Sequence, residues 1–270
     1  MAVLAGFLSG CVQRLFYLPD RAVYDSPARA GLKFEVVKFS SRDGTRLAGW
    51  FIPASDRPDP RNAKGTVVHF HGNAQNLTAH WSFLEWLPAR GFNVFVFDYR
   101  GYCESDGTAE TKGVVEDSGS ALDYIRTRKD IDPQKLLVFG QSLGGAKAIA
   151  VVGAGNRAGV RAVAAEASFS SYSAMANSAL PGAGLLMDDT YSPDRFVANL
   201  APIPLLLIHG TGDSVVPIAH SQTLLAAARE PKRLVAVEGG RHLETLQPRF
   251  ADNYRNVLVE FFDSALSAGR

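Results

Sequence analysis

The stretch F-G-Q-S-L-G-G at residues 139–145 decides the fold class of this 270-residue chain. It places Ser142 between the apolar run Leu136–Phe139 and a small-residue segment, Leu143–Val152, that has the composition of a helix. A strand that passes directly into a helix forces the residue between them into a sharp turn, and the flanking glycines leave room for it. The turn lifts the serine hydroxyl above the edge of a sheet, beside a helix N-terminus whose free N–H groups stabilise an anion. This context favours a nucleophilic serine over a chance match to G-x-S-x-G.

The composition is that of an ordinary globular enzyme. Hydrophobic residues make up 46% and charged residues 20% of the chain, and 270 residues suffice for one domain with a large core. Lys and Arg number 28 against 27 Asp and Glu, so no basic excess points to a nucleic-acid partner. The interior of the sequence has no apolar stretch of about 18 residues that would span a bilayer.

The N-terminus carries a separate signal. Residues 1–8 are apolar, and residues 8–11 read L-S-G-C, which resembles the lipobox of bacterial lipoproteins, where the cysteine is acylated. This predicts a signal segment at residues 1–11, a domain at residues 12–270, and membrane attachment through acylated Cys11 on the periplasmic side of a bacterial cell envelope. No Lys or Arg precedes the apolar run. Two alternatives therefore stay open: the true start of the protein lies upstream, or the run is an apolar helix that packs on the domain of a cytoplasmic protein.

The chain has only two cysteines, Cys11 and Cys103. Acylation of Cys11 would leave Cys103 alone, so no disulfide framework is expected. No Cys/His cluster has metal-ligand spacing, and we predict no metal site.

Strand-like and helical segments alternate after about residue 64, which predicts an α/β fold with a mostly parallel sheet. The predicted strands are 34–39 and 47–52, which form an antiparallel hairpin, then 66–70, 93–97, 136–139, 160–165, 205–208 and 234–237. The predicted helices are 77–90, 113–128, 143–152, 221–229 and 248–268.

Segment 168–200 interrupts this alternation, because it is rich in glycine and proline and reads as a loop. We expect it to form a short cap over the C-terminal edge of the sheet, where ligands bind in open α/β sheets. Its candidate substrate-pocket residues are Phe169, Tyr172, Met175, Leu185, Leu186, Met187 and Tyr191, of which Phe169, Tyr172, Met187 and Tyr191 are the principal ones. It is equally consistent with the sequence that these side chains only cover the core.

A serine nucleophile needs a base, and the base needs an orienting acid. His242 is the predicted base, because it lies in a glycine loop after the last predicted strand and before the final helix. Asp213 is the predicted acid, since it ends a glycine-rich loop that follows a strand. Asp213 could also cap a helix beginning near Pro217, and the two roles are compatible.

The other histidines have simpler interpretations. His69 and His209 lie in strands, where we expect satisfied core or supporting roles, and His80 and His220 lie in helical stretches that we expect at the surface. His71 is expected to brace the loop that follows the strand 66–70.

Acyl transfer also requires N–H donors for the tetrahedral oxyanion. Leu143, directly after the nucleophile, should supply one backbone N–H. Asn73, in the loop H-G-N-A-Q-N at residues 71–76, should supply the second.

Five motifs occur in order: H-G-N-A at 71–74, D-Y-R-G-Y at 98–102, G-Q-S-L-G-G at 140–145, H-G-T-G-D at 209–213 and G-R-H at 240–242. Together they resemble the alpha/beta-hydrolase superfamily, in its prolyl-oligopeptidase-like or serine-aminopeptidase-like branch, over about residues 33–268. The resemblance implies an eight-stranded sheet, a Ser142–Asp213–His242 triad and no cofactor. Cys103 stands where the family usually has glycine, so we expect a local backbone effect there and no nucleophilic role.

These features predict a serine hydrolase that cleaves a small-molecule carboxylic ester or thioester through an acyl-enzyme. An aminopeptidase-like or amidase-like hydrolase is the alternative among enzymes. A dehalogenase is disfavoured, because that chemistry requires an aspartate in place of Ser142. A non-catalytic, envelope-associated binding protein is the alternative outside enzymes. The sequence does not determine the oligomeric state.

Overall fold

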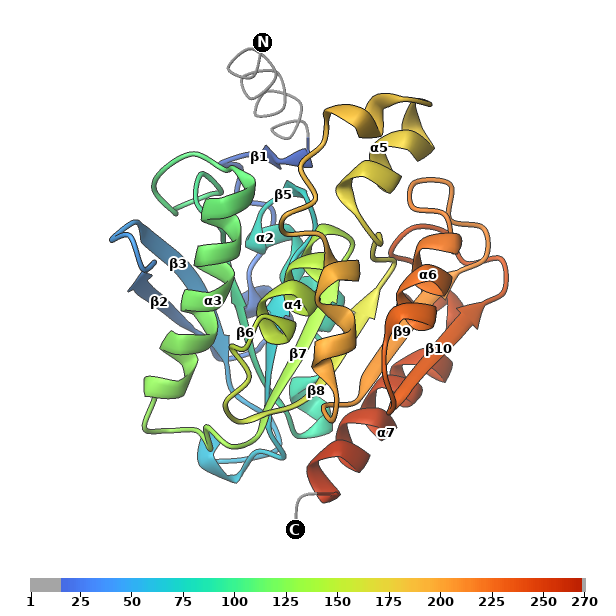
Figure 1. Ribbon diagram of the computed structural model, residues 1–270. Coiled ribbons are helices and arrows are strands. Elements are labelled where there is room, and N and C mark those ends of the chain that lie inside the picture. Colours follow the sequence, from blue (N-terminus) through green and yellow to red (C-terminus); the bar gives the residue numbers. More distant parts are fainter. Residues whose placement is uncertain (1–15, 269–270) are drawn as a thin grey trace.

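The computed structural model describes residues 16–268, so Cys11 and the rest of the predicted signal segment lie outside the described residues. The centre is an eight-stranded sheet with the strand order β10-β9-β8-β7-β4-β6-β3-β2 (Figure 1). Strands β2 and β3 pair antiparallel, β3 also runs antiparallel to β6, and the six strands from β6 to β10 in this order are parallel. The predicted mostly parallel α/β sheet is confirmed.

Every predicted strand is present, with its ends displaced by two residues at most. The strands are β2 (Glu35–Ser40), β3 (Arg46–Ile52), β4 (Thr66–Phe70), β6 (Asn93–Phe97), β7 (Leu136–Gln141), β8 (Val160–Glu166), β9 (Leu205–Gly210) and β10 (Lys232–Val237). Strands β4, β6, β7 and β9 are buried at every residue. That burial on both faces explains why these strands are continuous apolar runs in the sequence.

Helices cover both faces of the sheet. Helices α3 (Thr111–Thr127), α4 (Leu143–Gly153) and α6 (Ala219–Ala227) pack on one face, and α2 (Leu77–His80) and α7 (Asn253–Ser267) pack on the other (Figure 1). A separate apolar core therefore lies between the sheet and the helices on each of its two faces. Within residues 16–268, no helix is both long and apolar enough to cross a membrane.

Two local predictions were wrong. The expected helix at 77–90 is instead α2 followed by two 3-10 turns, Trp81–Leu84 and Pro88–Arg90. Pro88 has no backbone N–H to continue an α-helix, although Trp81, Leu84 and Leu87 are buried at near-helical spacing. The cap segment 168–200 is not a plain loop, because Tyr172–Ala179 forms helix α5 and three 3-10 turns follow it.

A short parallel pair, β1 (Leu18–Pro19) with β5 (Ala74–Gln75), lies outside the main sheet. It belongs to an N-terminal strap, residues 16–24, that crosses the loop after β4. The strap is held by Asn76, whose side-chain amide donates to Asp20 Oδ1 at 2.7 Å and to the Ala22 carbonyl at 2.8 Å. Cys103 N–H also donates to the Asp20 carbonyl at 2.9 Å.

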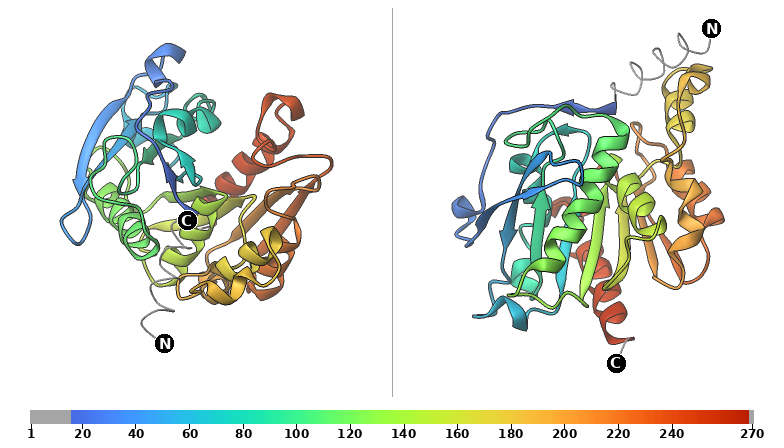
Figure 2. Two further views of the ribbon diagram at one scale, coloured as in Figure 1. Left: turned by 90° about the horizontal axis from the view of Figure 1, so that it is seen from above. Right: turned by 60° about the vertical axis from the view of Figure 1, so that its left-hand side comes forward.

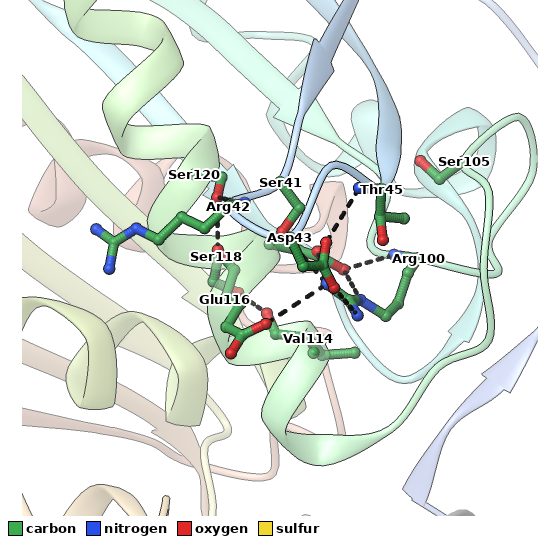
Figure 3. Close-up of polar contacts among 12 residues, drawn as sticks. Ser41, Arg42, Asp43, Thr45, Arg100, Ser105, Val114, Glu116, Ser118 and Ser120 are labelled. Carbon is green, nitrogen blue, oxygen red and sulfur yellow. Dashed lines mark hydrogen bonds and ion pairs between the residues drawn. The ribbon is translucent and has the colours of Figure 1, made fainter.

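Arg100, just beyond β6, connects its own loop to α3 and to the β2–β3 turn through the polar contacts drawn in Figure 3. Its guanidinium donates to Asp117 of α3 at 2.7 Å and to Asp43 of the β2–β3 turn at 2.8 Å. The backbone N–H of Arg100 donates to Asp117 as well, at 2.8 Å. Bidentate bonding to the fully buried Asp117 carboxylate fixes the loop 98–103, whose tyrosines support the candidate site.

Candidate active site

Ser142 stands at a strained turn between β7 and α4. Its backbone has φ 52° and ψ −117°, a conformation that non-glycine residues adopt at a cost. A Cβ atom on Gly140 would lie 2.4 Å from the Gly144 carbonyl oxygen, and one on Gly144 would lie 1.9 Å from the Phe70 carbonyl oxygen. Glycine is therefore required at both positions by close backbone approach. The N–H of Ser142 donates to the Glu166 carbonyl at 2.8 Å, which anchors the turn to β8.

Asp213 and His242 meet at the same edge of the sheet. Asp213 follows β9 and His242 follows β10, and the two parallel strands are neighbours. The distance between His242 Nδ1 and Asp213 Oδ2 is 2.8 Å. The second carboxylate oxygen accepts the N–H groups of Val215 at 2.9 Å and Val216 at 2.8 Å. The carboxylate thus orients the histidine and caps a turn, while helix α6 begins later, at Ala219.

The environment of Asp213 keeps its carboxylate ionised. Burial alone would raise its pKa, but hydrogen bonds from His209, His242 and the Val216 N–H outweigh burial and hold the pKa below its ordinary value. His209 Nε2 lies 3.4 Å from Asp213 Oδ2 and donates to the Val216 carbonyl at 2.7 Å. Its Nδ1 lies 2.7 Å from Ser221 Oγ, so the expected satisfied core role of His209 is confirmed.

The loop after β4 is held from several sides. His71 Nδ1 donates to the Gly72 carbonyl at 2.8 Å. Because the C=O and N–H of a trans peptide point in opposite directions, this bond also fixes the direction of the Asn73 N–H, the predicted oxyanion donor. The Asn73 carbonyl accepts from Tyr102 Oη at 2.6 Å and from the Leu18 N–H of the strap at 2.9 Å. Both peptides flanking Asn73 are therefore fixed before any substrate arrives.

Buried polar groups lie beneath this loop. His71 Nε2 is 3.3 Å from Asp98 Oδ1, and both side chains are fully buried. The Tyr99 hydroxyl donates to the His71 carbonyl at 3.1 Å, which fits the predicted bracing role of His71. His80 lies 3.0 Å from the Ala74 carbonyl through Nε2, and burial lowers the pKa of His80 to about 3. The expected surface positions of His80 and His220 are wrong, since each is only 5% exposed.

A hydrogen-bonded chain of buried side chains links the serine turn to the histidine loop. His69 Nε2 lies 2.9 Å from Gln141 Oε1, and Gln141 Nε2 donates to Glu166 Oε2 at 2.7 Å. Glu166 Oε1 accepts the N–H of Thr245 at 3.1 Å and also the Thr245 hydroxyl. Burial raises the pKa of Glu166, although the bonds from Thr245 and Gln141 oppose that shift. The one signal of this chain of hydrogen bonds in the sequence was a carboxylate that ends an otherwise apolar strand, and the chain was not predicted.

The predicted pocket residues divide into two groups. Phe169 and Tyr172 are buried, with ring centroids 5.1 Å apart, and both pack on Phe16 of the strap. Met187 packs against the same core and Tyr191 is half-buried. Met175 also packs against this core, whereas Leu185 and Leu186 are exposed. The role of these seven side chains in binding substrate stays a prediction.

A buried lysine adjoins this aromatic group. Lys147, one turn into α4, is fully buried and donates to the Tyr172 hydroxyl. Its Nζ lies 5.0 Å from the Tyr172 ring centroid and 5.5 Å from that of Tyr17. Burial lowers the pKa of Lys147 to about 7. Helix α4, the cap and the strap therefore meet around one amine.

Cys103 has φ 40°, a left-handed conformation that explains why glycine suits this position. Burial and the nearby Asp98 carboxylate raise the pKa of the thiol to about 11. The thiol is thus a poor nucleophile, and the expected backbone effect is confirmed. Among residues 16–268, no group of three or more His, Cys, Asp or Glu side chains is arranged to hold a metal ion.

Comparison with known proteins identifies the family. The "Uncharacterized protein YfhR" of Escherichia coli K12 is 47% identical over 252 residues, which cover 93% of this chain and 87% of that protein. The "Alpha/beta hydrolase domain-containing protein WAV2" of Arabidopsis thaliana is 33% identical over 256 residues, 86% of this chain and 82% of that protein. The chain belongs to the alpha/beta-hydrolase superfamily. Residues 61–189 of this hydrolase also match the family described as "Serine aminopeptidase, S33".

Solved structures confirm the alpha/beta-hydrolase fold. An esterase of Pyrococcus furiosus superposes with a TM-score of 0.75 at 19% identity and covers 92% of this hydrolase and 98% of that chain. The esterase domain of a Rhodothermus marinus protein superposes with a TM-score of 0.66 at 24% identity, over 86% and 99% of the two chains. At these identities the likeness establishes the shared fold alone.

Proposed function

We propose that this hydrolase cleaves a carboxylic ester or thioester through an acyl-enzyme on Ser142. The observation that carries the proposal is the 2.8 Å contact between His242 Nδ1 and Asp213 Oδ2. Glu166 links the histidine loop to the Ser142 turn through Thr245 and Gln141. An ionised, hydrogen-bonded aspartate on Nδ1 leaves Nε2 of His242 free of a proton, as a general base requires.

In the proposed reaction, His242 Nε2 removes the hydroxyl proton of Ser142 as its oxygen attacks the substrate carbonyl carbon. The Leu143 and Asn73 N–H groups stabilise the resulting oxyanion. Collapse of the tetrahedral intermediate breaks the bond to the alcohol or thiol, which takes the proton from His242. Water, activated by His242, then attacks the acyl-enzyme, releases the acid and restores Ser142.

A second candidate is an amidase-like or aminopeptidase-like hydrolase, which the match to the serine aminopeptidase family favours. An aminopeptidase needs a carboxylate for the substrate's amino group. Asp189 of the cap already accepts from Ser173 N–H at 3.0 Å and from Ser192 Oγ at 2.5 Å. Since these serines occupy the carboxylate, Asp189 is poorly placed for that task, and we favour the ester or thioester.

Turnover of matched substrates tests this choice. Purified protein is assayed with a chain-length series of para-nitrophenyl esters, with acyl thioesters and with aminoacyl para-nitroanilides, each beside Ser142→Ala. The proposal predicts Ser142-dependent cleavage of esters or thioesters with little cleavage of anilides. Anilide turnover exceeding ester turnover would favour the aminopeptidase, and no turnover of any substrate by the wild type would favour a binding protein.

We further propose that Cys11 is acylated and anchors the hydrolase to the cell envelope on its periplasmic side. The support is the L-S-G-C sequence after an apolar run. Metabolic labelling with a radioactive fatty acid should mark the wild type and not Cys11→Ala. Equal labelling of both proteins, or of neither, would exclude the anchor.

A further inference from the structure

The cap carries an exposed apolar tip. Leu180, Leu185 and Leu186 are 66%, 91% and 47% exposed, and they lie within seven consecutive residues. We call these three side chains the cap tip. The surrounding stretch, residues 167–187, contains 21 residues and no charged side chain. Clustered exposed leucines on an uncharged segment differ from the single exposed apolar residues that ordinary surfaces show.

The cap tip is an ordered turn. The Gly184 N–H donates to Asn177 Oδ1 at 2.8 Å, which ties the turn back onto helix α5. Backbone bonds from Ala183 N–H to the Leu180 carbonyl at 3.0 Å and from Leu185 N–H to the Gly182 carbonyl at 3.2 Å complete it. The three leucines are therefore exposed on a turn that is itself hydrogen-bonded and regular.

The cap tip lies at the catalytic end of the molecule. Ser142, Asp213 and His242 all follow the C-terminal ends of parallel strands, and α5 and β1 lie beyond that same end (Figures 1 and 2). The right-hand view of Figure 2 shows α5 projecting past the body of the domain. Leu18 of the strap, 55% exposed, and Val215, 54% exposed and two residues from Asp213, extend the apolar character of this end.

The charges around the cap tip exclude some classes of binding partner. Between Arg161 and Arg195 the chain contains no Lys or Arg, while Asp188, Asp189 and Asp194 flank the tip on its C-terminal side. A nucleic acid or an acidic protein segment would find no cation here to pair with. Insertion into hydrocarbon needs no ion pair, and it is favoured in proportion to the apolar area removed from water.

The first described residue of the N-terminal strap, Phe16, lies against the cap. Phe16 packs on Tyr172, the first residue of α5, with ring centroids 5.0 Å apart, and on Phe169 at 6.0 Å. Phe16 follows Cys11 by five positions in the sequence. Even a fully extended chain of that length spans at most about 18 Å. An acyl group on Cys11 would therefore hold a bilayer within reach of the cap.

We propose that the cap tip inserts into the hydrocarbon of a lipid bilayer and docks the catalytic edge of the sheet on the membrane surface. A lipid anchor at Cys11 would strengthen the docking by adding a second contact beside the first. The inserted side chains supply the contact themselves, so docking is independent of hydrolysis at Ser142.

Tryptophan fluorescence with full-length protein tests the proposal. Leu185→Trp places a reporter at the cap tip, and Val36→Trp places one at a 53% exposed site on edge strand β2 as a matched control. Each variant is titrated with phosphatidylcholine vesicles that carry brominated acyl chains, which quench only inserted tryptophans. We expect the fluorescence of Leu185→Trp to shift to the blue and to be quenched when vesicles are added. We expect vesicles to change the fluorescence of Val36→Trp no more than that of the wild type.

Vesicle flotation supplies the second measurement. Replacing Leu180, Leu185 and Leu186 together by serine should weaken partitioning about 100-fold or more in the Cys11→Ala background, since each loses its apolar burial. Raised salt and anionic lipid should change partitioning little, because the tip has no cation. Val36→Ser serves as the control.

Three results would overturn the proposal. Flotation unaffected by the triple serine change, with no quenching at position 185, would leave the N-terminus as the only membrane contact. A blue shift at position 185 that depends on protein concentration and needs no vesicles would assign the tip to a second copy of the chain. A blue shift without vesicles at every dilution would show that residues 1–15 cover the tip.

Discussion

Glu166 on β8 holds Thr245, three residues beyond His242, through its N–H at 3.1 Å and its hydroxyl. The other carboxylate oxygen holds Gln141, the residue before Ser142, at 2.7 Å. All three groups donate to Glu166, which suits an ionised carboxylate, since such a group can only accept. One buried side chain therefore sets the serine turn and the histidine loop relative to each other.

Glu166→Gln should impair catalysis by misplacing the two loops. The substituted amide presents an NH2 group to a neighbour that also donates, so one buried donor loses its acceptor, at a cost of about 1–3 kcal/mol in unfolding free energy. We expect kcat on an ester to fall about tenfold or more while KM changes little, because substrate binding groups stay intact. Thr245→Ser keeps the hydroxyl and should behave like the wild type, whereas Thr245→Val should resemble Glu166→Gln. Unchanged kcat in Glu166→Gln would remove the positioning role.

Asp213→Asn should reduce kcat by about 10⁴, with the fold retained. The Val215 and Val216 N–H groups would hold the amide oxygen, which turns the NH2 group toward His242 and forces the wrong tautomer. Asp188→Asn in the cap is the matched control and should keep wild-type kcat. If Asp188→Asn lost activity and Asp213→Asn kept it, the assignment of the acid would be wrong.

Gly144→Ala should be far more damaging than Gly155→Ala. At position 144 the new Cβ would lie 1.9 Å from the Phe70 carbonyl oxygen, so the strand and helix must separate. At position 155, where φ is 116°, no atom lies within 4 Å of the new Cβ, and only backbone strain of about 1–3 kcal/mol is added. Urea unfolding should show a small loss for Gly155→Ala and a loss above about 4 kcal/mol, or no soluble protein, for Gly144→Ala. Equal losses would contradict the close-approach argument.

Lys147 should make stability rise with pH above neutrality. Its pKa is lowered to about 7 in the folded protein by burial, and its ordinary value is 10.5, so the unfolded chain binds more protons between these two values. The free energy of unfolding therefore rises with pH in that window, by about 1.4 kcal/mol per pH unit at most for this one group. Tyr172 and Tyr17 face the amine, and Glu110 acts on it by charge.

Urea unfolding at pH 7 and pH 9 checks this prediction. Lys147→Met removes the titrating group and should flatten the rise, while Lys112→Met, at a 68% exposed side chain, should keep it. The pH range stays below 10 because the buried tyrosines, whose pKa values burial raises, contribute the opposite slope once unfolded tyrosine ionises. A rise that persists in Lys147→Met would assign it to another group.

The sheet and the residues proposed for catalysis could be predicted because local sequence determines them. Buried parallel strands must be continuous apolar runs, and the side chains that follow their C-terminal ends necessarily share one edge. Helix α5 was missed because its serines, asparagine and alanines resemble a loop. In the structure, Ser171 caps the helix by accepting the Ala174 N–H at 3.1 Å.

Contacts between distant segments could not be predicted. Glu166 and Thr245 lie 79 residues apart, and Tyr17 and Tyr172 lie 155 apart. No periodicity links such pairs, because their proximity depends on the order of the strands. The strap that holds the Asn73 carbonyl was not predicted for the same reason, because Leu18 and Pro19 have no local pattern of a strand.

Covalent labelling of Ser142 is the decisive test of the proposed nucleophile. A fluorophosphonate probe is incubated with the wild type, Ser142→Ala, Cys103→Ser and heat-denatured wild type, and the labelled peptide is sequenced by mass spectrometry. If Ser142 is the nucleophile, we expect one adduct on Ser142 in the wild type and in Cys103→Ser, and none in the other two samples. Absence of label from folded wild type, or an adduct on another residue that persists in Ser142→Ala, would contradict this assignment.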